Sequence, residues 1–238
     1  MSEQCTEERL LKDVEKHTMT VIRADGVNRH LRFRQPDTSS YWFDLITWPG
    51  ALCINGDCGT YVFSRTQDMF EFFRTDANYA HKKGFRLGIN PGYWGEKLTA
   101  ISAQGGYQKF SEDKFTAAIK DYFDNYVQED IEAEAEARKE AAENDTPLSQ
   151  ADEEHFKAKA EARDELWSEI TEQVLDRAEY GEGTASTAAY EFAHKDFQFQ
   201  DFFETNLKEL TFSYIWCCYA IAWGIEQFDA TTTVAVSA

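Results

Sequence analysis

The sequence predicts an α+β protein: an antiparallel sheet covered by an aromatic-rich C-terminal helix, with a long acidic helical hairpin inserted. Three observations predict this fold class. Short segments with strand periodicity alternate with turn residues between positions 18 and 65, two long segments of helical periodicity fill 111–180, and a dense apolar run occupies 214–225. This order places the hairpin between two parts of one core.

Charge separates the hairpin from the rest of the chain. Residues 111–180 contain 22 acidic and 8 basic side chains, whereas the first 110 residues contain 13 acidic and 14 basic ones. A content of 42% hydrophobic and 15% aromatic residues is ample for a core, so the acidity does not indicate a disordered chain. The negative charge disfavours direct binding of nucleic acid.

The elements before the hairpin follow from local patterns. A short amphipathic helix is expected over 3–17, and strands over 19–22, 31–34, 42–46 and 61–63. The turn residues between them are Asp25-Gly26, Pro36-Asp37, Pro49-Gly50 and Asn55-Gly56. Such regular turns favour an antiparallel meander. A short helix over 67–74 then places Met69, Phe70 and Phe73 on one apolar face.

Cysteine usage and hydropathy indicate a cytoplasmic protein. Five irregularly spaced cysteines fit a reducing compartment better than a disulfide framework. Residues 1–17 lack an apolar stretch, so no secretory signal is expected, and the run 214–225 is too short to cross a membrane.

No metal site and no cofactor are expected. Cys53 and Cys58 flank the Asn55-Gly56 turn, so their thiols are predicted to face each other across a hairpin. A zinc site would need two more ligands, which the adjacent Cys217 and Cys218 cannot easily supply together. The glycine-rich segment 84–109 lacks the spacing of a phosphate-binding loop.

The hairpin begins at a well-marked helix start. Ser111 is suited to cap the first helix, Glu112 and Asp113 complement its dipole, and Phe110 can pack on Phe115. Large apolar residues then recur at intervals of three and four up to residue 131. Beyond Pro147, a second helix is expected from Ser149 to the glycines at 181 and 183, antiparallel to the first.

Five carboxylates lie at helical spacing on the first helix, opposite its apolar face; we call them the acidic stripe: Asp121, Asp124, Glu132, Glu136 and Glu140. Like charges at such spacing destabilise an isolated helix by about 0.2–0.5 kcal/mol per pair. One explanation is that the stripe mimics nucleic-acid phosphates and occupies the basic groove of another protein. The other is a solvated hairpin whose charge only maintains solubility.

The last segment is again rich in aromatic residues. The run 214–225 is apolar around most of a helix, which predicts burial across the N-terminal sheet. We therefore expect a core domain formed by 1–110 and 182–238, with the hairpin as 111–181. Residues 232–236 are expected to be frayed or to form a final short strand.

A catalytic alternative rests on three aspartates. Asp44, Asp57 and Asp68, with Arg65, are candidates to meet at one sheet edge and hold a divalent metal for hydrolysis or nucleic-acid metabolism. Aspartates in turns and at helix starts are also common for local reasons. No hydrolase or metalloprotease motif is present, so no catalytic residue is assigned.

Several segments resemble a family of uncharacterised proteins encoded by tailed bacteriophages and prophages. These are Thr47-Trp48-Pro49-Gly50, the segments 56–65 and 68–74, Tyr93-Trp94-Gly95-Glu96-Lys97, and the run 216–225. The resemblance spans both ends of the chain and covers the hairpin less. It implies a bacterial host cytoplasm, but it carries no activity and no functional residue.

The leading expectation is a non-enzymatic inhibitor of a host defence or DNA-processing complex, of anti-restriction or anti-CRISPR type. Its partner would be a host protein with a basic nucleic-acid-binding surface, contacted through the acidic stripe. No membrane partner is expected. The alternatives are the metal-dependent hydrolase described above and an adaptor that forms a homodimer through the hairpin.

Overall fold

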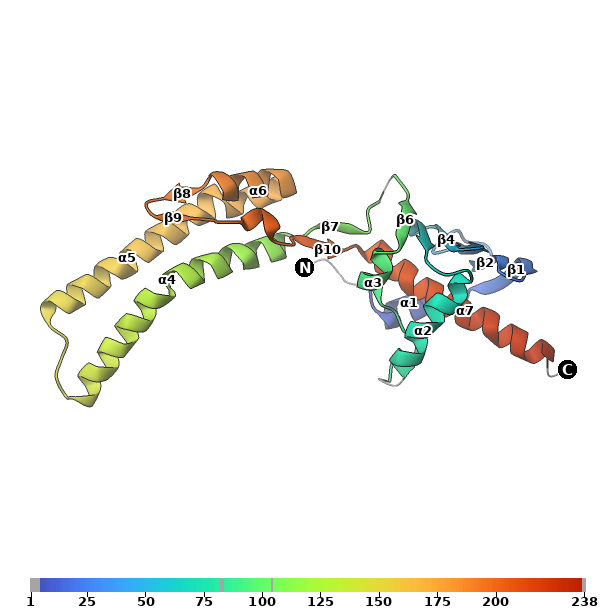
Figure 1. Cartoon of the computed structure of the whole chain (residues 1–238), viewed down its shortest axis with the longest axis horizontal. Helices are drawn as coiled ribbons and strands as arrows, with labels where there is room; N and C mark the ends of the chain where they lie inside the picture. Colours follow the sequence, from blue (N-terminus) through green and yellow to red (C-terminus); the bar gives the residue numbers. More distant parts are fainter. Residues whose placement is uncertain (1–4, 82–83, 104, 237–238) are drawn as a thin grey trace. The chain divides into compact units, whose positions relative to one another are not determined.

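The structure is a computed structural model that describes residues 5–81, 84–103 and 105–236. The chain divides into two compact units (Figure 1). We call residues 1–109 with 210–238 the core unit, and residues 110–209 the hairpin unit. The α+β fold class predicted from the sequence is confirmed.

The core unit is built on a six-stranded antiparallel sheet in which every strand pairs with its neighbour in sequence. Its strands are β1 (Thr18–Asp25), β2 (Asn28–Arg34), β3 (Phe43–Trp48), β4 (Ala51–Gly56), β5 (Gly59–Ser64) and β6 (Leu98–Ile101). The meander was expected, but β4 and β6 were not. Cross-strand pairing supplies the backbone hydrogen bonds that these weakly patterned segments need.

The predicted turns are partly confirmed. Gly26 and Gly50 have positive φ values of 57° and 87°, as tight hairpin turns after β1 and β3 require. The turn predicted at Asn55-Gly56 is wrong, because Gly56 pairs with Gly59 and the chain reverses at 57–58. A β-carbon at Gly56 would overlap the Trp42 carbonyl oxygen, so this glycine serves close strand packing rather than the turn.

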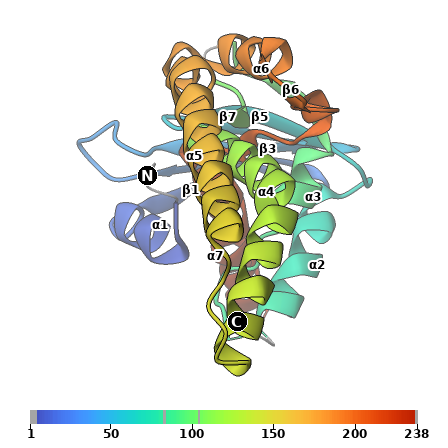
Figure 2. The same ribbon diagram turned by 90° about the vertical axis from the view of Figure 1, so that its left-hand side faces the viewer.

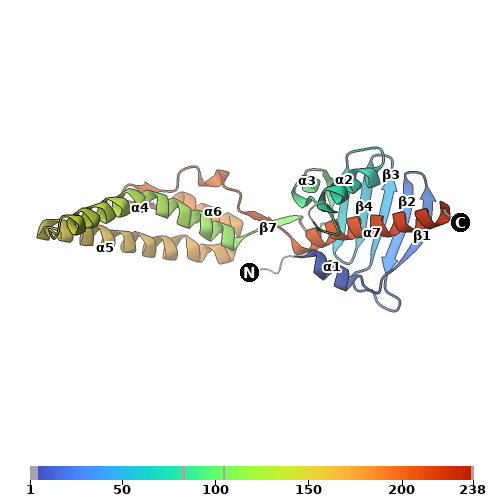
Figure 3. The same ribbon diagram turned by 90° about the horizontal axis from the view of Figure 1, so that it is seen from below.

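One face of the sheet forms the core. The inward residues of β2 to β5 are at most 2% exposed: Leu31, Phe33, Phe43, Leu45, Leu52, Ile54, Tyr61 and Phe63. Helix α7 (Phe212–Val236) covers them, as predicted for the C-terminal run (Figure 3). Phe33 and Phe43 stack at 4.7 Å, and Trp216 meets Phe43 edge-on at 5.7 Å.

Three further helices complete the core unit: α1 (Glu7–Asp13), α2 (Met69–His81) and α3 (Pro91–Gly95). Helices α1 and α2 both contact α7. The final short strand expected over 232–236 is wrong, because these residues continue α7. Burial of the apolar first half of α7 fixes the helix, and its backbone hydrogen bonds extend it through the threonines.

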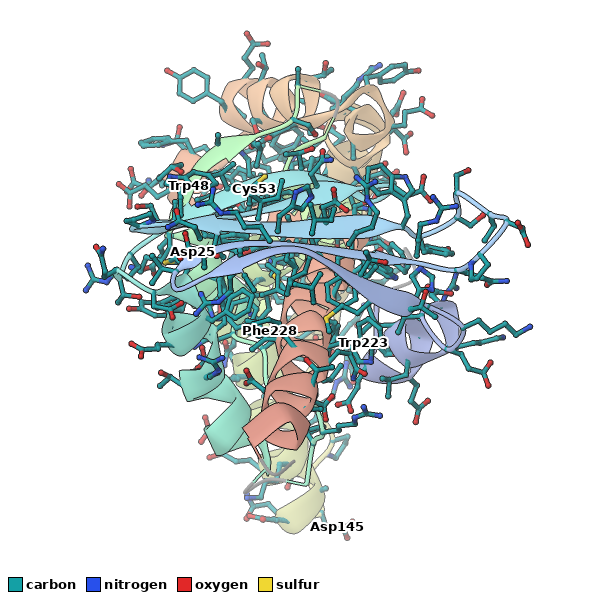
Figure 4. All side chains as sticks on the ribbon, turned by 90° about the vertical axis from the view of Figure 1, so that its right-hand side faces the viewer. Asp25, Trp48, Cys53, Asp145, Trp223 and Phe228 are labelled. Atoms are coloured by element: carbon teal, nitrogen blue, oxygen red, sulfur yellow. The ribbon has the colours of Figure 1, made fainter. Side chains whose placement is uncertain are left out.

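Two long helices dominate the hairpin unit, α4 (Glu112–Glu143) and α5 (Gln150–Gln173), and they lie side by side (Figure 2). The predicted caps are confirmed: Ser111 Oγ accepts from Lys114 N at 3.3 Å, and Ser149 Oγ accepts from Asp152 N at 3.2 Å. Asp145 lies in the loop that connects the two helices (Figure 4). Its φ is +47°.

The unit continues beyond the predicted end of the hairpin. α5 is followed by the 3₁₀ segment η1 (Leu175–Tyr180), α6 (Glu182–Glu191), β8 (Ala193–His194), β9 (Phe197–Gln198) and the 3₁₀ turn η2 (Phe202–Glu204). The strands β7 (Gln108–Phe110) and β10 (Lys208–Leu210) pair where the chain enters and leaves the unit.

The hairpin unit therefore extends to residue 209, beyond the predicted domain boundary at 181. The predicted boundary places Phe192, Phe197, Phe199 and Phe202 in the core domain, but in the structure they form a cluster with Phe115 and other apolar residues of α4 and α5. Their aromatic side chains supply the buried area that the alanine-rich hairpin lacks. The hairpin unit thus has a hydrophobic core of its own.

Candidate functional site

The structure places all five residues of the acidic stripe on the exposed side of α4. The buried residues of the same helix are apolar: Phe115, Ile119 and Val127. Because an α-helix rises about 1.5 Å per residue, the stripe extends over roughly 28 Å along α4. The predicted separation of an apolar and an acidic face is therefore present.

Most of the stripe lacks a neutralising cation. Lys120 Nζ lies 2.6 Å from Asp124 Oδ2. Glu132 accepts a hydrogen bond of 2.7 Å from the neutral amide of Gln128. Within the described part of the chain, no Lys, Arg or His side chain forms an ion pair with the stripe residues other than Asp124. Four of its five charges are thus left for solvent or a partner.

Lys120, Lys139 and Lys157 pair within their own helix, whereas Arg138, Lys159 and Arg163 connect the two helices. The interhelical role of the latter three explains why they do not neutralise the stripe, since their charged groups lie toward the neighbouring helix. The interhelical ion pairs are Arg138–Glu153 at 3.2 Å, Arg163–Glu134 at 3.3 Å and Lys159–Asp130 at 3.1 Å.

Glu134 shows the contrast with the stripe. Its side chain is 22% exposed and accepts hydrogen bonds from Arg138 at 3.0 Å and from Arg163 at 3.3 Å. These two bonds, that of Arg138 foremost, lower the pKa of the Glu134 carboxyl below its ordinary value. Glu134 therefore stabilises the helix pair.

The charge of the whole chain is concentrated in the hairpin unit. Residues 110–209 contain 28 acidic and 10 basic side chains, a formal charge of −18 out of −19. The core unit is therefore almost neutral. Such a separation concentrates electrostatic attraction for a basic partner on one unit.

The aspartates of the catalytic alternative do not converge. Each has a separate structural role: Asp44 binds Arg32 and His30 on β2, Asp57 accepts from Tyr41 N at 2.9 Å, and Asp68 forms an ion pair with Arg29 and caps α2 through Phe70 N. Arg65 is exposed. Over the described ranges, no group of three His, Cys, Asp or Glu side chains is arranged to hold a metal ion.

Asp44 is the most buried of these carboxyls, with a side chain 5% exposed. Burial by itself would raise its pKa, but hydrogen bonds from Arg32 and His30 outweigh burial and lower the pKa below its ordinary value. Arg32 makes a two-pronged contact, with distances of 2.9 and 2.8 Å. This network stabilises the face of the sheet opposite α7.

The predicted facing of Cys53 and Cys58 is wrong. Cys53 pairs with Val62 and lies on the opposite side of the sheet from Trp223 and Phe228 of α7 (Figure 4). The Cys58 carbonyl accepts from Cys217 Sγ of α7 at 3.8 Å. Burial raises the pKa of Cys53 and raises that of Cys58 to about 12, which disfavours the thiolate that metal binding or nucleophilic attack requires.

A polar cavity in the hairpin unit was not expected from the sequence. It has a volume of about 220 Å³, and its lining includes Arg163 of α5 and His194 of β8. We call it the hairpin cavity. The available signal was the polar triplet 194–196 between phenylalanines 192 and 197, but nothing local indicates that this triplet faces α5.

Comparisons with family models, curated proteins and solved structures found no match to this chain. Among the described residues, no helix has the length and apolar character needed to span a membrane.

Proposed function

We propose that this protein is a non-enzymatic inhibitor that binds, through the acidic stripe, the basic nucleic-acid-binding surface of a host defence or DNA-processing protein. A bacteriophage origin and an anti-restriction or anti-CRISPR role belong to the same proposal, on the resemblance described above. The observation that supports it best is the set of exposed stripe carboxylates, of which only Asp124 has a cation partner among the described residues.

The spacing of these carboxylates supports contact with a groove that binds phosphates. Successive stripe residues four apart are separated by about 6 Å along the helix, whereas phosphates of one DNA strand are spaced about 3.4 Å along its axis. The stripe alone is therefore sparser than a DNA strand. Exposed acids of α5, among them Glu154, Glu161 and Asp164, add to the charge of the same unit.

The rigidity of the hairpin supports the same proposal. Interhelical ion pairs and the aromatic cluster at residues 192–202 hold α4 and α5, so the carboxylates are ordered before binding. A preorganised surface loses less conformational entropy on association than a flexible acidic tail.

The hydrolase alternative has no comparable support, because its three aspartates are engaged separately by Arg32, Tyr41 and Arg29. The homodimer alternative makes a different prediction from the inhibitor. It requires self-association through the hairpin in the absence of any host protein, which light scattering of the purified chain measures directly.

The first experiment is capture of partners from bacterial lysate at low and high salt, followed by competition with purified components. A nucleic-acid-binding protein should be retained at low salt and released at high salt, because exposed charge pairs are screened. The chain should then raise the apparent Kd of that protein for DNA or RNA. Retention of no nucleic-acid-binding protein would contradict the proposal.

The decisive variant is Glu132→Gln, Glu136→Gln and Glu140→Gln together. Exposed ion pairs contribute up to about 1 kcal/mol each, so inhibition should weaken about tenfold or more. A matched control changes three exposed acids of the core unit to glutamine: Glu8, Glu15 and Glu71. The control has the same net charge as the stripe variant and should inhibit like the wild type; equal inhibition by the stripe variant would refute phosphate mimicry.

A further inference from the structure

The sheet of the core unit has a second face, opposite α7, which we call the outer face. Because side chains alternate along a strand, Cys53 points to the outer face between Leu52 and Ile54, which point inward and are 0% exposed. Helices α7 and α2 both pack on the inward residues of the sheet (Figure 3). These two helices therefore leave the outer face uncovered.

An apolar row crosses the outer face from β3 to β6. The cross-strand pairs that form it are Ile46–Cys53, Cys53–Val62 and Val62–Ala100. The first three of these residues are half-buried and Ala100 is exposed. Trp48, two residues beyond Ile46 on the same face, is 42% exposed. An antiparallel sheet with one solvated face usually carries polar side chains on that face, so this apolar row needs a reason.

The outer face of β3 to β6 also lacks exposed charge. In these four strands, which the structure describes in full, Asp44 is the single charged residue, and it is 3% exposed and paired with Arg32. Thr60 Oγ1 donates to Asn55 Oδ1 at 2.7 Å, so these two polar side chains are also paired within the sheet. The centres of protein interfaces are depleted of charged residues in the same way. Burial of this face against an apolar surface would leave none of these groups without a partner.

We propose that the outer face binds the outer face of a second copy of this chain, in a symmetric dimer. Two antiparallel sheets pack face to face at about 10 Å, and the side chains of the two faces interdigitate. The apolar row has no exposed charge to select a charged partner, whereas the same row of a second copy matches it in chemistry. Twofold pairing, in which one patch meets itself, is the commonest symmetry of homo-oligomers.

The size of the face and the charge of the chain both favour this occupant. Six strands about 4.8 Å apart and about 20 Å long give the face a projected area of roughly 600 Å². A specific interface buries about 600–1,000 Å² on each partner, so the face reaches the lower end of that range. Two hairpin units, each of charge −18, repel each other, so a second copy meets the least repulsion at the almost neutral core unit.

The test is sedimentation velocity of the purified full chain over a range of concentrations. A concentration-dependent dimer of twice the chain mass of 27.4 kDa is expected. Dimerisation should be several-fold stronger at about 0.15 M than at about 0.01 M salt, because the Debye length falls from about 30 Å to about 8 Å and the hairpin units repel less. Binding of a basic partner by the acidic stripe weakens with salt instead, so failure of one proposal is distinguishable from failure of the other.

Two variants distinguish the outer face from the hairpin as the dimer contact. Val62→Lys places a charge in the apolar row and should weaken dimerisation about tenfold or more, because that charge would be buried without a partner. Ile131→Lys likewise replaces a β-branched residue by lysine, but on α4, where Ile131 is 48% exposed. It has the same net charge as Val62→Lys, and it should dimerise like the wild type.

Alkylation of Cys53 tests the contact without any substitution. Its rate, followed by mass spectrometry of the Cys53 peptide, should fall about tenfold at the concentration where about nine-tenths of the chain is dimeric, because only the monomer leaves the thiol accessible. Cys58, whose carbonyl oxygen lies 3.8 Å from Cys217 Sγ of α7, is the internal control. Its rate should not change with concentration.

The proposal is overturned if the chain is monomeric at every concentration, or if Cys53 reacts equally fast in the monomer and the dimer. It is also overturned if Ile131→Lys, rather than Val62→Lys, abolishes the dimer, because the hairpin would then be the contact. Protection of Cys53 by another protein in the absence of a dimer would mean a different occupant and would overturn it as well. If circular dichroism shows that Val62→Lys does not fold, the Cys53 rates decide.

Discussion

Neutralising the acidic stripe should stabilise helix α4 while it removes the binding surface. In the variant Glu132→Gln, Glu136→Gln and Glu140→Gln, the repulsion between neighbours four residues apart is relieved twice, by about 0.2–0.5 kcal/mol each time. The last turn of α4 has no basic residue, so neutralising Glu140 there also removes an unfavourable interaction with the helix dipole, worth about 0.3 kcal/mol.

The three substitutions change the stability of α4 little in other ways. Glutamine and glutamate have similar helix propensities, and glutamine at 132 still accepts from Gln128 through its amide oxygen. Glu136 and Glu140 form no ion pair with described residues that the change would break. The expected gain for α4 is therefore about 1 kcal/mol.

Hydrogen exchange measured by mass spectrometry on α4 peptides reports this gain locally. Exchange should slow about fivefold at low salt, because 1 kcal/mol corresponds to that factor. The difference should shrink at 1 M salt, where the Debye length is about 3 Å. The control variant at Glu8, Glu15 and Glu71 should leave α4 exchange unchanged. Faster exchange in the stripe variant would refute the reasoning, since it would mean that these carboxylates stabilise the helix.

Three further predictions concern the folding of the two units. Asp44→Asn should destabilise the core unit by about 1–3 kcal/mol at pH 7 in urea unfolding. Because the pKa of Asp44 is lowered in the folded state, its contribution to the free energy of unfolding is present above the ordinary pKa of about 3.9 and is lost as pH falls through the folded-state pKa. The difference in the free energy of unfolding between wild type and Asp44→Asn must therefore shrink as pH falls through that range. Gly56→Ala should destabilise by about 2 kcal/mol or more in the same assay, because its β-carbon would overlap the Trp42 carbonyl oxygen and lie 2.7 Å from Phe43 Cα; an unchanged midpoint would contradict that packing. Phe115→Ala, at a position 0% exposed, should cost about 3–5 kcal/mol and accelerate hydrogen exchange within 110–209 only; equal acceleration in the sheet would contradict the division into two units.

Much of the fold follows from local patterns. Ser111 and Ser149 are predicted and observed as helix caps, and the stripe is predicted and observed on the exposed side of α4, because both depend only on residues within four positions. Hairpin turns at Gly26 and Gly50 follow from the same short range. Strand β4 was missed because its pairing with β3 and β5, rather than its own pattern, defines it.

The properties of the candidate sites depend on long-range contacts that the sequence does not reveal. That the stripe lacks cations is not readable from the sequence, since Arg138 and Lys159 are closer in sequence to stripe residues than to their partners on the other helix. The hairpin cavity was missed because Arg163 and His194 are 31 positions apart and meet only through the fold. The aspartate cluster was suggested by residue type, and the register of the strands separates it.

By itself, the sequence determined the α+β class, the capped starts of α4 and α5, the buried C-terminal helix and the acidic face of α4, because periodicity, capping and charge act over a few residues. Only the tertiary structure decided that 182–209 belongs to the hairpin unit, that Arg138, Lys159 and Arg163 bridge α4 and α5, and that Arg163 and His194 line one cavity. The physical reason is that burial and ion pairing are settled by which surfaces meet, and long-range packing is not encoded in any short window of the chain.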